Sequence, residues 1–258
     1  MKKYTFPLAF LALAATTLSA PLAHAASASS ALSNVYIQLF DLDPLDGITP
    51  ALTFSNGDSS LYGYAFDGVG LNYNDVGPMG SALANSVTDG GAQAASAVLA
   101  GNVWLPASGN GANSSAAAVG LNANAYGQGQ LINSQFTVTA KTVVVMTATG
   151  QASAAAALGE SAYASAYVGM QDLTSNNYSY GQAYSQVDVN GNAYGSGGPL
   201  TVQASFVNLL TGNQIGNIYA VAYSSASGVT PVPEPTSYAL MLAGILALGF
   251  VSQRRRQH

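Results

Sequence analysis

Apolar and polar residues alternate with a period of two through much of the chain. Val35, Ile37 and Leu39 alternate with polar neighbours, residues 136–141 and 200–206 repeat the pattern, and TVVVM at residues 142–146 forms a nearly continuous apolar run. Successive side chains of a strand point to opposite faces, so alternation predicts half-buried strands, and the apolar run predicts a more central strand.

Turn signals separate these runs: PLDG at residues 44–47, Asn56-Gly57, Asn190-Gly191 and TGN at residues 211–213. Asn-Gly between alternating runs predicts a hairpin, because both residues tolerate positive φ. Several strands with short turns and no amphipathic helix indicate an all-β fold, an antiparallel β-sandwich or jelly-roll-like body. Residues 80–129 are dominated by Ala, Ser, Asn and Gly, and strand, short helix and loop all stay open there.

The first 25 residues have the pattern of a secretory signal peptide. Lys2 and Lys3 precede an apolar stretch at residues 6–18, and Ala23-His24-Ala25 forms a small-x-small cleavage site. We therefore expect cleavage between Ala25 and Ala26. A retained N-terminal membrane helix is the alternative, although the apolar stretch is short for one.

The body is expected at residues 26–224, followed by a Ser/Gly/Pro linker at residues 225–232. Both this linker and the small-residue segment 26–33 are expected to be flexible. The last segment holds Pro233-Glu234-Pro235, an uncharged run at residues 238–251 and Arg254, Arg255 and Arg256. As a helix the run spans roughly 21 Å, short of the hydrocarbon core, so it predicts a weak transmembrane anchor with the arginines on the cytoplasmic side.

Residues 233–258 resemble the PEP-CTERM sorting signal of Gram-negative bacteria, a tail also catalogued as an ice-binding protein C-terminal domain. The resemblance implies that Pro233, Glu234 and Pro235 are recognised by an exosortase, a membrane-embedded transpeptidase-like protease, and that Arg254, Arg255 and Arg256 set topology. It implies export across the inner membrane and processing near the Pro-Glu-Pro triplet. Ser252-Gln253 and Gln257-His258 flank the arginines as additions to the pattern.

Charge is scarce between the two end segments. Residues 26–232 contain no His, Arg or Cys and a single lysine, Lys141, against ten acidic residues. One lysine cannot neutralise an array of phosphates, which excludes nucleic acid and anionic lipid as partners. A neutral partner such as exopolysaccharide, a divalent cation or another copy of the chain remains.

The same composition argues against an enzyme. A Ser-His-Asp triad lacks its histidine, zinc lacks its preferred ligands, and there is no P-loop. Only a carboxylate pair survives, for which Asp41, Asp43 or Asp46 would have to act with an acid such as Glu160. We expect no catalysis and no cofactor.

DLDPLDG places Asp41, Asp43 and Asp46 at the close spacing that suits calcium. The spacing fails the EF-hand template, because glycine stands at position 7 and Leu52 at position 12. The favoured interpretation is an Asp-rich turn whose carboxylates accept backbone N–H groups, with a calcium site of another design as the alternative.

Tyrosines recur at strand spacing in SAYASAYVG, NYSYGQAYSQ and IYAVAY. Cross-strand pairing that stabilises a sheet is the favoured interpretation, and an exposed face that stacks on neutral sugars or on a second copy is the alternative. Trp104 is expected to pack rather than bind.

The sequence as a whole predicts an exported, acidic, non-enzymatic surface or extracellular-matrix protein, associated with biofilm or exopolysaccharide and released after C-terminal processing. A carbohydrate- or calcium-binding module and a permanently membrane-anchored envelope protein are the alternatives.

Overall fold

The computed structural model of the protein describes residues 25–106, 108–120, 122–196 and 198–228. All regular elements in these ranges are strands: β1 (Ala25–Asp41), β2 (Leu52–Phe66), β3 (Leu71–Pro78), β4 (Leu83–Asp89), β5 (Ala92–Leu99), β6 (Gly111–Val119), β7 (Asn124–Val138), β8 (Thr142–Ala155), β9 (Ser161–Asp172), β10 (Tyr178–Val187), β11 (Ala193–Gly195), β12 (Leu200–Asn208) and β13 (Gln214–Ser227). Among these residues there is no helix with the length and hydropathy to cross a membrane. The predicted signal peptide and C-terminal transmembrane helix lie outside the described residues.

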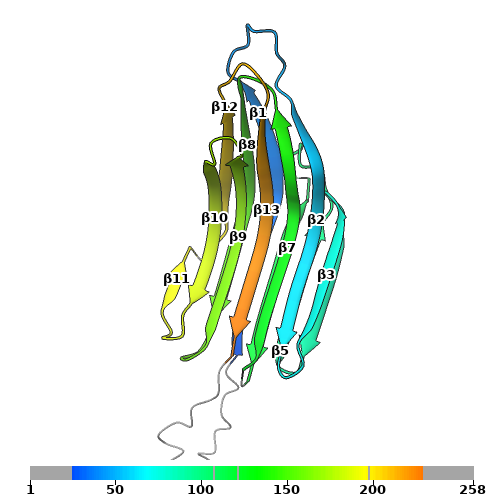
Figure 1. Ribbon diagram of the computed structural model, residues 1–258. Coiled ribbons are helices and arrows are strands. Elements are labelled where there is room, and N and C mark those ends of the chain that lie inside the picture. The colour runs from blue at the N-terminus through cyan, green and yellow to red at the C-terminus, as the bar shows by residue number, and fades with distance from the viewer. Residues whose placement is uncertain (1–24, 107, 121, 197, 229–258) are drawn as a thin grey trace, which may run out of the picture.

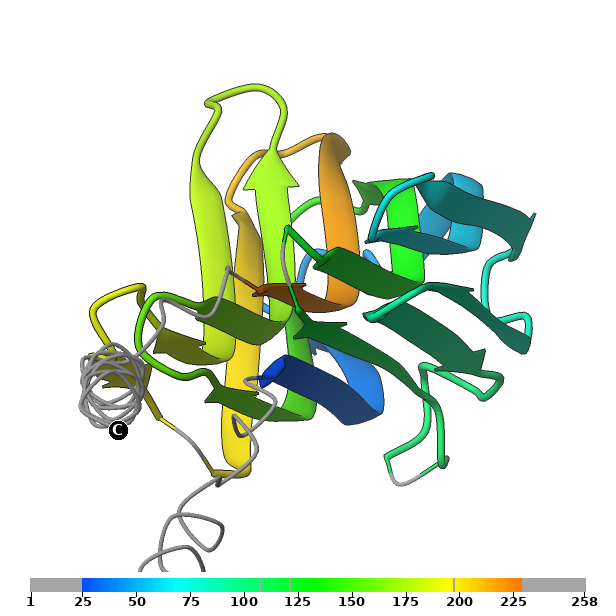
Figure 2. The ribbon, with the colours of Figure 1, turned by 90° about the horizontal axis from the view of Figure 1, so that it is seen from below.

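The strands form two antiparallel sheets that lie face to face (Figures 1 and 2). One sheet has six strands in the order β12-β8-β1-β6-β5-β4, and the other has seven in the order β11-β10-β9-β13-β7-β2-β3. Phe136 of β7 meets Phe206 of β12 edge to face, with ring centroids 5.0 Å apart, so side chains of the two sheets interlock. The prediction of an all-β, antiparallel, sandwich-like body is confirmed.

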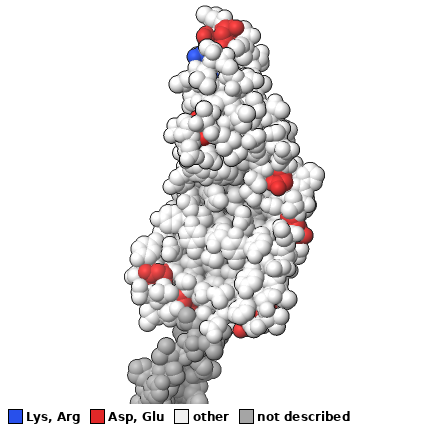
Figure 3. Space-filling view, in the orientation of Figure 1, with Lys and Arg blue, Asp and Glu red and all other residues white. Residues whose placement is uncertain are grey.

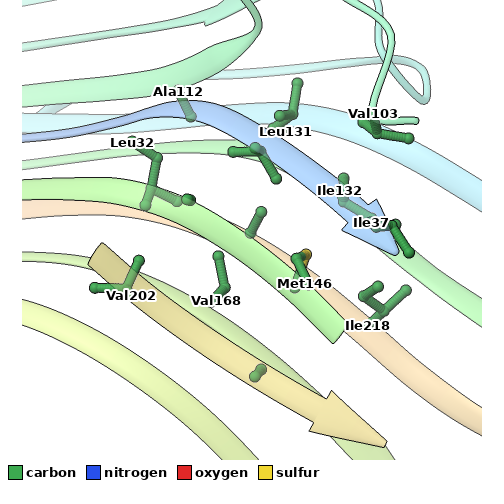
Figure 4. Close-up of a cluster of buried hydrophobic side chains, with 14 of the residues drawn as sticks. Leu32, Ile37, Val103, Ala112, Leu131, Ile132, Met146, Val168, Val202 and Ile218 are labelled. Atoms are coloured by element: carbon green, nitrogen blue, oxygen red, sulfur yellow. The ribbon is translucent and has the colours of Figure 1, made fainter. Parts of the chain in front are cut away.

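The core between the sheets has two chemically different halves. One half contains large side chains from both sheets, among them Leu131, Ile132, Met146 and Ile218 (Figure 4). The other half, beside the first residues of β1 and the last of β13, consists of alanines: Ala26, Ala28, Ala65, Ala92, Ala94, Ala116, Ala118, Ala123, Ala125, Ala152, Ala162, Ala164 and Ala226. Small side chains allow the two sheets to approach closely there while burying little area per residue.

Glycines in β7 mark the close approach. A Cβ added to Gly129 would lie 2.7 Å from the carbonyl oxygen of Asn113 and 3.0 Å from that of Ala97. Both oxygens belong to strands of the six-stranded sheet, so the β7 backbone packs directly on the opposite sheet. Buried serines also connect the two sheets: the hydroxyl of Ser114 in β6 hydrogen-bonds that of Ser30 in β1, at 3.0 Å, and that of Ser224 in β13, at 2.9 Å.

The flexibility predicted for residues 26–33 is wrong, whereas only residues 225–228 of the linker predicted at residues 225–232 are among the described residues. Residues 26–33 belong to β1, where Ala26 pairs with Ala118 and Ala28 with Ala116 and Ala154. Alternate small side chains of this segment point into the alanine half of the core, so its ordering follows from burial of Ala26 and Ala28. At the other end, β13 continues to Ser227, three residues into the predicted linker.

The turn predictions have mixed outcomes. Residues 188–192 connect β10 and β11 as a hairpin, with Gly191 at φ 78°. Gly47, the last residue of the predicted 44–47 turn, has φ 75°. Asn56-Gly57, in contrast, lies inside β2, where Asn56 has φ 53° and the register with β7 shifts between Ser55 and Asp58. There the positive φ produces a β-bulge rather than a hairpin. Residues 80–129, left open between three states, form β4, β5, β6 and the start of β7.

The first and last described residues lie at the same end of the molecule (Figure 1). β1 starts at Ala25 opposite Val119, and the Gly228 N–H donates to Ala123 O at 2.8 Å. The loop between β1 and β2, which contains the DLDPLDG segment, projects from the opposite end. The chain therefore enters and leaves the body at one end and exposes its acidic loop at the other.

Candidate functional site

The outer surface of the seven-stranded sheet carries most of the tyrosines. In β9 and β13 they alternate with small, buried residues such as Ala164 and Ala222, which face the core. The register brings tyrosines of neighbouring strands onto the same outer side, for example Tyr64 opposite Tyr126. We call this surface the tyrosine face, formed by Tyr62, Tyr64, Tyr126, Tyr163, Tyr167, Tyr178, Tyr180, Tyr184, Tyr219 and Tyr223.

Ring contacts run across the strands of this face. Tyr126 meets Tyr62 and Tyr223 edge to face at centroid distances of 5.2 and 4.9 Å, and Tyr223 meets Tyr163 at 5.6 Å. A second group joins Tyr219 to Tyr178 in a stacked geometry at 5.5 Å. Each such pair contributes about 0.5–1.5 kcal/mol beyond its buried area, so the tyrosines stabilise the sheet as predicted. Their outer sides nevertheless remain partly exposed, up to 61% at Tyr180.

A groove of about 220 Å³ lies within the tyrosine face, on the outer side of the alanine half of the sandwich. Ser225 of β13 is paired with Tyr126 on one side and with Tyr163 on the other. A small side chain between two large ones leaves a trough, with serine at its floor and tyrosine rings at its walls. We call it the Ser225 groove; Tyr64, Asn124, Ser161, Gln186 and Ser227 complete its polar and aromatic lining.

Hydrogen bonds hold two of the wall hydroxyls. The Tyr126 hydroxyl donates to Gln128 Oε1 at 2.5 Å, and the Tyr163 hydroxyl accepts from Gln182 Nε2 at 3.0 Å. Gln182 Nε2 also donates to Ser165 Oγ at 2.7 Å. The side-chain amides of Gln128 and Gln182, which also face outward, thus fix the orientation of the two tyrosine rings.

Burial raises the pKa of three phenols of this face. It raises the pKa of Tyr126 to about 12, with smaller contributions from Tyr223, Tyr62 and Tyr167. Burial also raises the pKa of Tyr167 and of Tyr178 above the ordinary value. No charged side chain lines the Ser225 groove. At neutral pH the groove therefore offers rings, hydroxyls and amides, but no formal charge.

The structure places Asp41 at the end of β1 and Asp43 and Asp46 in the exposed loop that follows. Asp41 Oδ1 accepts the N–H of Asp43 at 2.9 Å, and Asp46 Oδ1 accepts that of Ile48 at 2.7 Å. These contacts are the Asx-type turns of the favoured interpretation. Within the described ranges, no three His, Cys, Asp or Glu side chains come close enough together to hold a metal ion.

Glu160 lies at the end of the sandwich opposite Asp41. It is 1% exposed, and its Oε2 accepts the N–H of Ala157 at 3.1 Å. Glu160 is thus separated from Asp41, Asp43 and Asp46, the acids with which it was considered as a pair. Figure 3 shows acidic side chains gathered at the top of the molecule and otherwise dispersed. The sole body lysine, Lys141, donates to Leu209 O at that top end.

Trp104 packs beside Phe54 with ring centroids 5.9 Å apart, while 42% of its surface stays exposed. Of the predicted signal-peptide cleavage residues, Ala25 begins β1 and Ala26 is buried in the alanine half, whereas Ala23 lies outside the described residues. Pro233, Glu234, Pro235, Arg254, Arg255 and Arg256 also lie outside them.

Of the residues that shape the Ser225 groove, only Tyr163, within SAYASAYVG, was a candidate for binding from the sequence. Ser225 and Ser227 stood in the expected linker, and Gln186 and Ser161 carry no motif. The only sequence signal is that these residues stand at outward-facing positions of their strands. They form a site only because the register aligns five strands, β2, β7, β9, β10 and β13.

Comparison with known proteins identifies the tail alone. Residues 231–256 match the family model described as the PEP-CTERM protein-sorting motif. The match includes the Pro-Glu-Pro triplet and the arginines of the expected sorting signal, and it does not extend to the strands. No curated protein and no solved structure was found to match the chain.

Proposed function

We propose that this chain is an exported, non-enzymatic protein of the cell surface or extracellular matrix whose C-terminal segment directs it to an exosortase. The observation that carries the proposal is the match of residues 231–256 to the PEP-CTERM protein-sorting motif. A sorting motif of this kind implies export, exosortase processing and surface or membrane association.

The body supports a structural or binding role rather than catalysis. Its acidic residues are held in turns or dispersed, as Asp41 and Asp46 illustrate. Its most distinctive surface is the uncharged tyrosine face. In this proposal the precursor is held at the inner membrane by its tail, is processed near Pro233-Glu234-Pro235, and then joins an exopolysaccharide-containing matrix.

The test replaces Pro233, Glu234 and Pro235 by alanine in the native host and measures the intact mass and the location of the protein. We expect the unaltered protein to lose its tail and leave the membrane, and the triple variant to keep Arg254–Arg256 and remain in the membrane fraction. Thr236→Ala with Ser237→Ala, changed beside the triplet, is the matched control and should be processed normally.

A tail that is retained in the unaltered protein would overturn processing and leave a permanently anchored envelope protein. Release of the triple variant at the normal rate would equally contradict recognition of the Pro-Glu-Pro triplet.

A further inference from the structure

We propose that the Ser225 groove binds one sugar ring of a neutral polysaccharide, and that the tyrosine face beside it contacts further rings of the same chain. This inference deepens the proposed matrix role, on which it rests for its biological setting. It identifies the partner by the chemistry that the groove presents.

The absence of charge selects a neutral ligand. The groove is lined by tyrosine, serine, asparagine, glutamine, alanine and valine side chains only. Lys141, the one cation of the described residues, lies at the opposite end of the molecule. An anionic ligand would find no cation in the groove, and a cationic ligand would find no carboxylate, so either would lose hydration without compensation.

The lining suits a ligand with apolar faces and polar edges. Aromatic walls from Tyr126 and Tyr163 bury C–H surface, while unengaged polar groups stand at the floor and rim. Ser225 Oγ and the Gln186 amide have no hydrogen-bond partner among the described residues, so both can bond ligand hydroxyls. A pyranose ring combines such faces with a belt of hydroxyl groups.

The dimensions favour part of a chain over a free small molecule. Pockets for drug-sized ligands measure about 300–1,000 Å³, whereas the Ser225 groove measures about 220 Å³. The groove can hold one ring, and the tyrosine face extends past it along the same side of the sheet, toward Tyr219 and Tyr178. Individual contacts are then weak, and a polymer gains affinity by engaging several positions at once.

The test uses the full chain, purified in detergent, in native affinity electrophoresis through gels that contain dextran, laminarin or galactomannan, with alginate as the anionic comparison. Ser225→Tyr fills the trough without removing any wall residue. Ser29→Tyr, on the exposed side of the six-stranded sheet, is the matched control, because Ser29 is also an outward serine with serines opposite it on both neighbouring strands.

We expect at least one neutral polysaccharide to retard the unaltered protein and the Ser29→Tyr variant equally. The Ser225→Tyr variant should bind that polysaccharide about ten-fold more weakly or worse, a loss of the size seen when a central contact of an interface is removed. Retardation relative to a polysaccharide-free gel should not change between pH 5 and 9, because no Asp, Glu, His, Lys or Arg side chain lines the groove. Thermal unfolding of both variants establishes that they are folded.

Three outcomes overturn the proposal: no retardation in any neutral gel, equal retardation of Ser225→Tyr, or stronger retardation in alginate. A concentration-dependent increase in mass that Ser225→Tyr abolishes, without polysaccharide binding, would assign the groove to a second copy of the chain instead. Tail processing is measured separately by intact mass, so failure of the sorting proposal and failure of this one are distinguishable.

Discussion

Replacement of Gly129 by alanine tests the close contact between the two sheets. The added Cβ would lie 2.7 Å from Asn113 O and 3.0 Å from Ala97 O, whereas ordinary contact begins at 3.4 Å. Both oxygens belong to backbones of paired strands, β6 and β5, so neither can move without shifting its strand. The methyl group must therefore separate the sheets locally or distort β7.

The expected magnitude combines two opposing effects. Overpacking a well-packed core costs about 1–3 kcal/mol. A Gly→Ala change also lowers the conformational entropy of the unfolded chain, which stabilises the folded state by about 0.4–1 kcal/mol. We expect a net loss of roughly 1–2 kcal/mol in the free energy of unfolding, which lowers Tm by roughly 2–8 °C for a body of this size.

The assay is urea unfolding followed by far-UV circular dichroism and by the fluorescence of Trp104. Gly212→Ala is the matched control, because a Cβ there meets nothing within 4 Å. Gly127→Ala should fall between the two, since its nearest backbone oxygen, Ser115 O, lies at 2.9 Å. The reasoning is refuted if Gly129→Ala unfolds at the same urea concentration as Gly212→Ala or at a higher one.

Three further predictions follow from buried or hydrogen-bonded polar groups. Asn110→Ala leaves the buried N–H and C=O of Val35 without the side-chain bonds of 2.8 and 2.7 Å, so urea unfolding should show a loss of about 2–5 kcal/mol, against little change for exposed Asn102→Ala. Asp89 has a lowered pKa because the backbone N–H groups of Asp67, Gly70 and Val69 donate to its carboxylate. The ionised carboxylate therefore stabilises the fold above about pH 4, and this stabilisation is lost in acid. The Asp89→Asn variant should have a lower free energy of unfolding than the unaltered protein at pH 7, and the difference should disappear as the pH falls. Burial raises the pKa of Tyr126 to about 12. The stability that its neutral phenol contributes is therefore fully present below pH 10 and is progressively lost as the pH rises toward 12. Tyr126→Phe should shift the midpoint of alkaline unfolding to higher pH, and an unchanged midpoint would contradict the raised pKa.

The strands with large alternating residues were predictable from the sequence, and those with small ones were not. Val35, Ile37 and Leu39 contrast sharply with their polar neighbours, so a period of two is visible without knowledge of the partner strand. Residues 26–33 are alanine and serine apart from Leu32, and alanine and serine differ too little in hydrophobicity to indicate a buried side. Their burial depends on an opposite sheet whose own residues are equally small, which is non-local information.

The candidate site depends even more on distant pairing. Tyr126, Tyr163 and Ser225 are far apart in the sequence, and the groove exists because the register places the serine between the two rings. A slip of one residue would turn Ser225 inward and remove the trough. Composition was thus enough to exclude nucleic acid and anionic lipid as partners, whereas the location of the groove required the structure.

β1 begins and β13 ends at the same end of the molecule (Figure 1), and this determines how far the body reaches from any attachment. Whatever holds the chain just after Gly228 also holds the end where β1 begins. β1 has 17 residues, and at about 3.3 Å per residue it spans roughly 56 Å. A tethered molecule would stand as a spacer of that height, with the Ser225 groove near its foot and the acidic β1–β2 loop presented outward to neighbouring material.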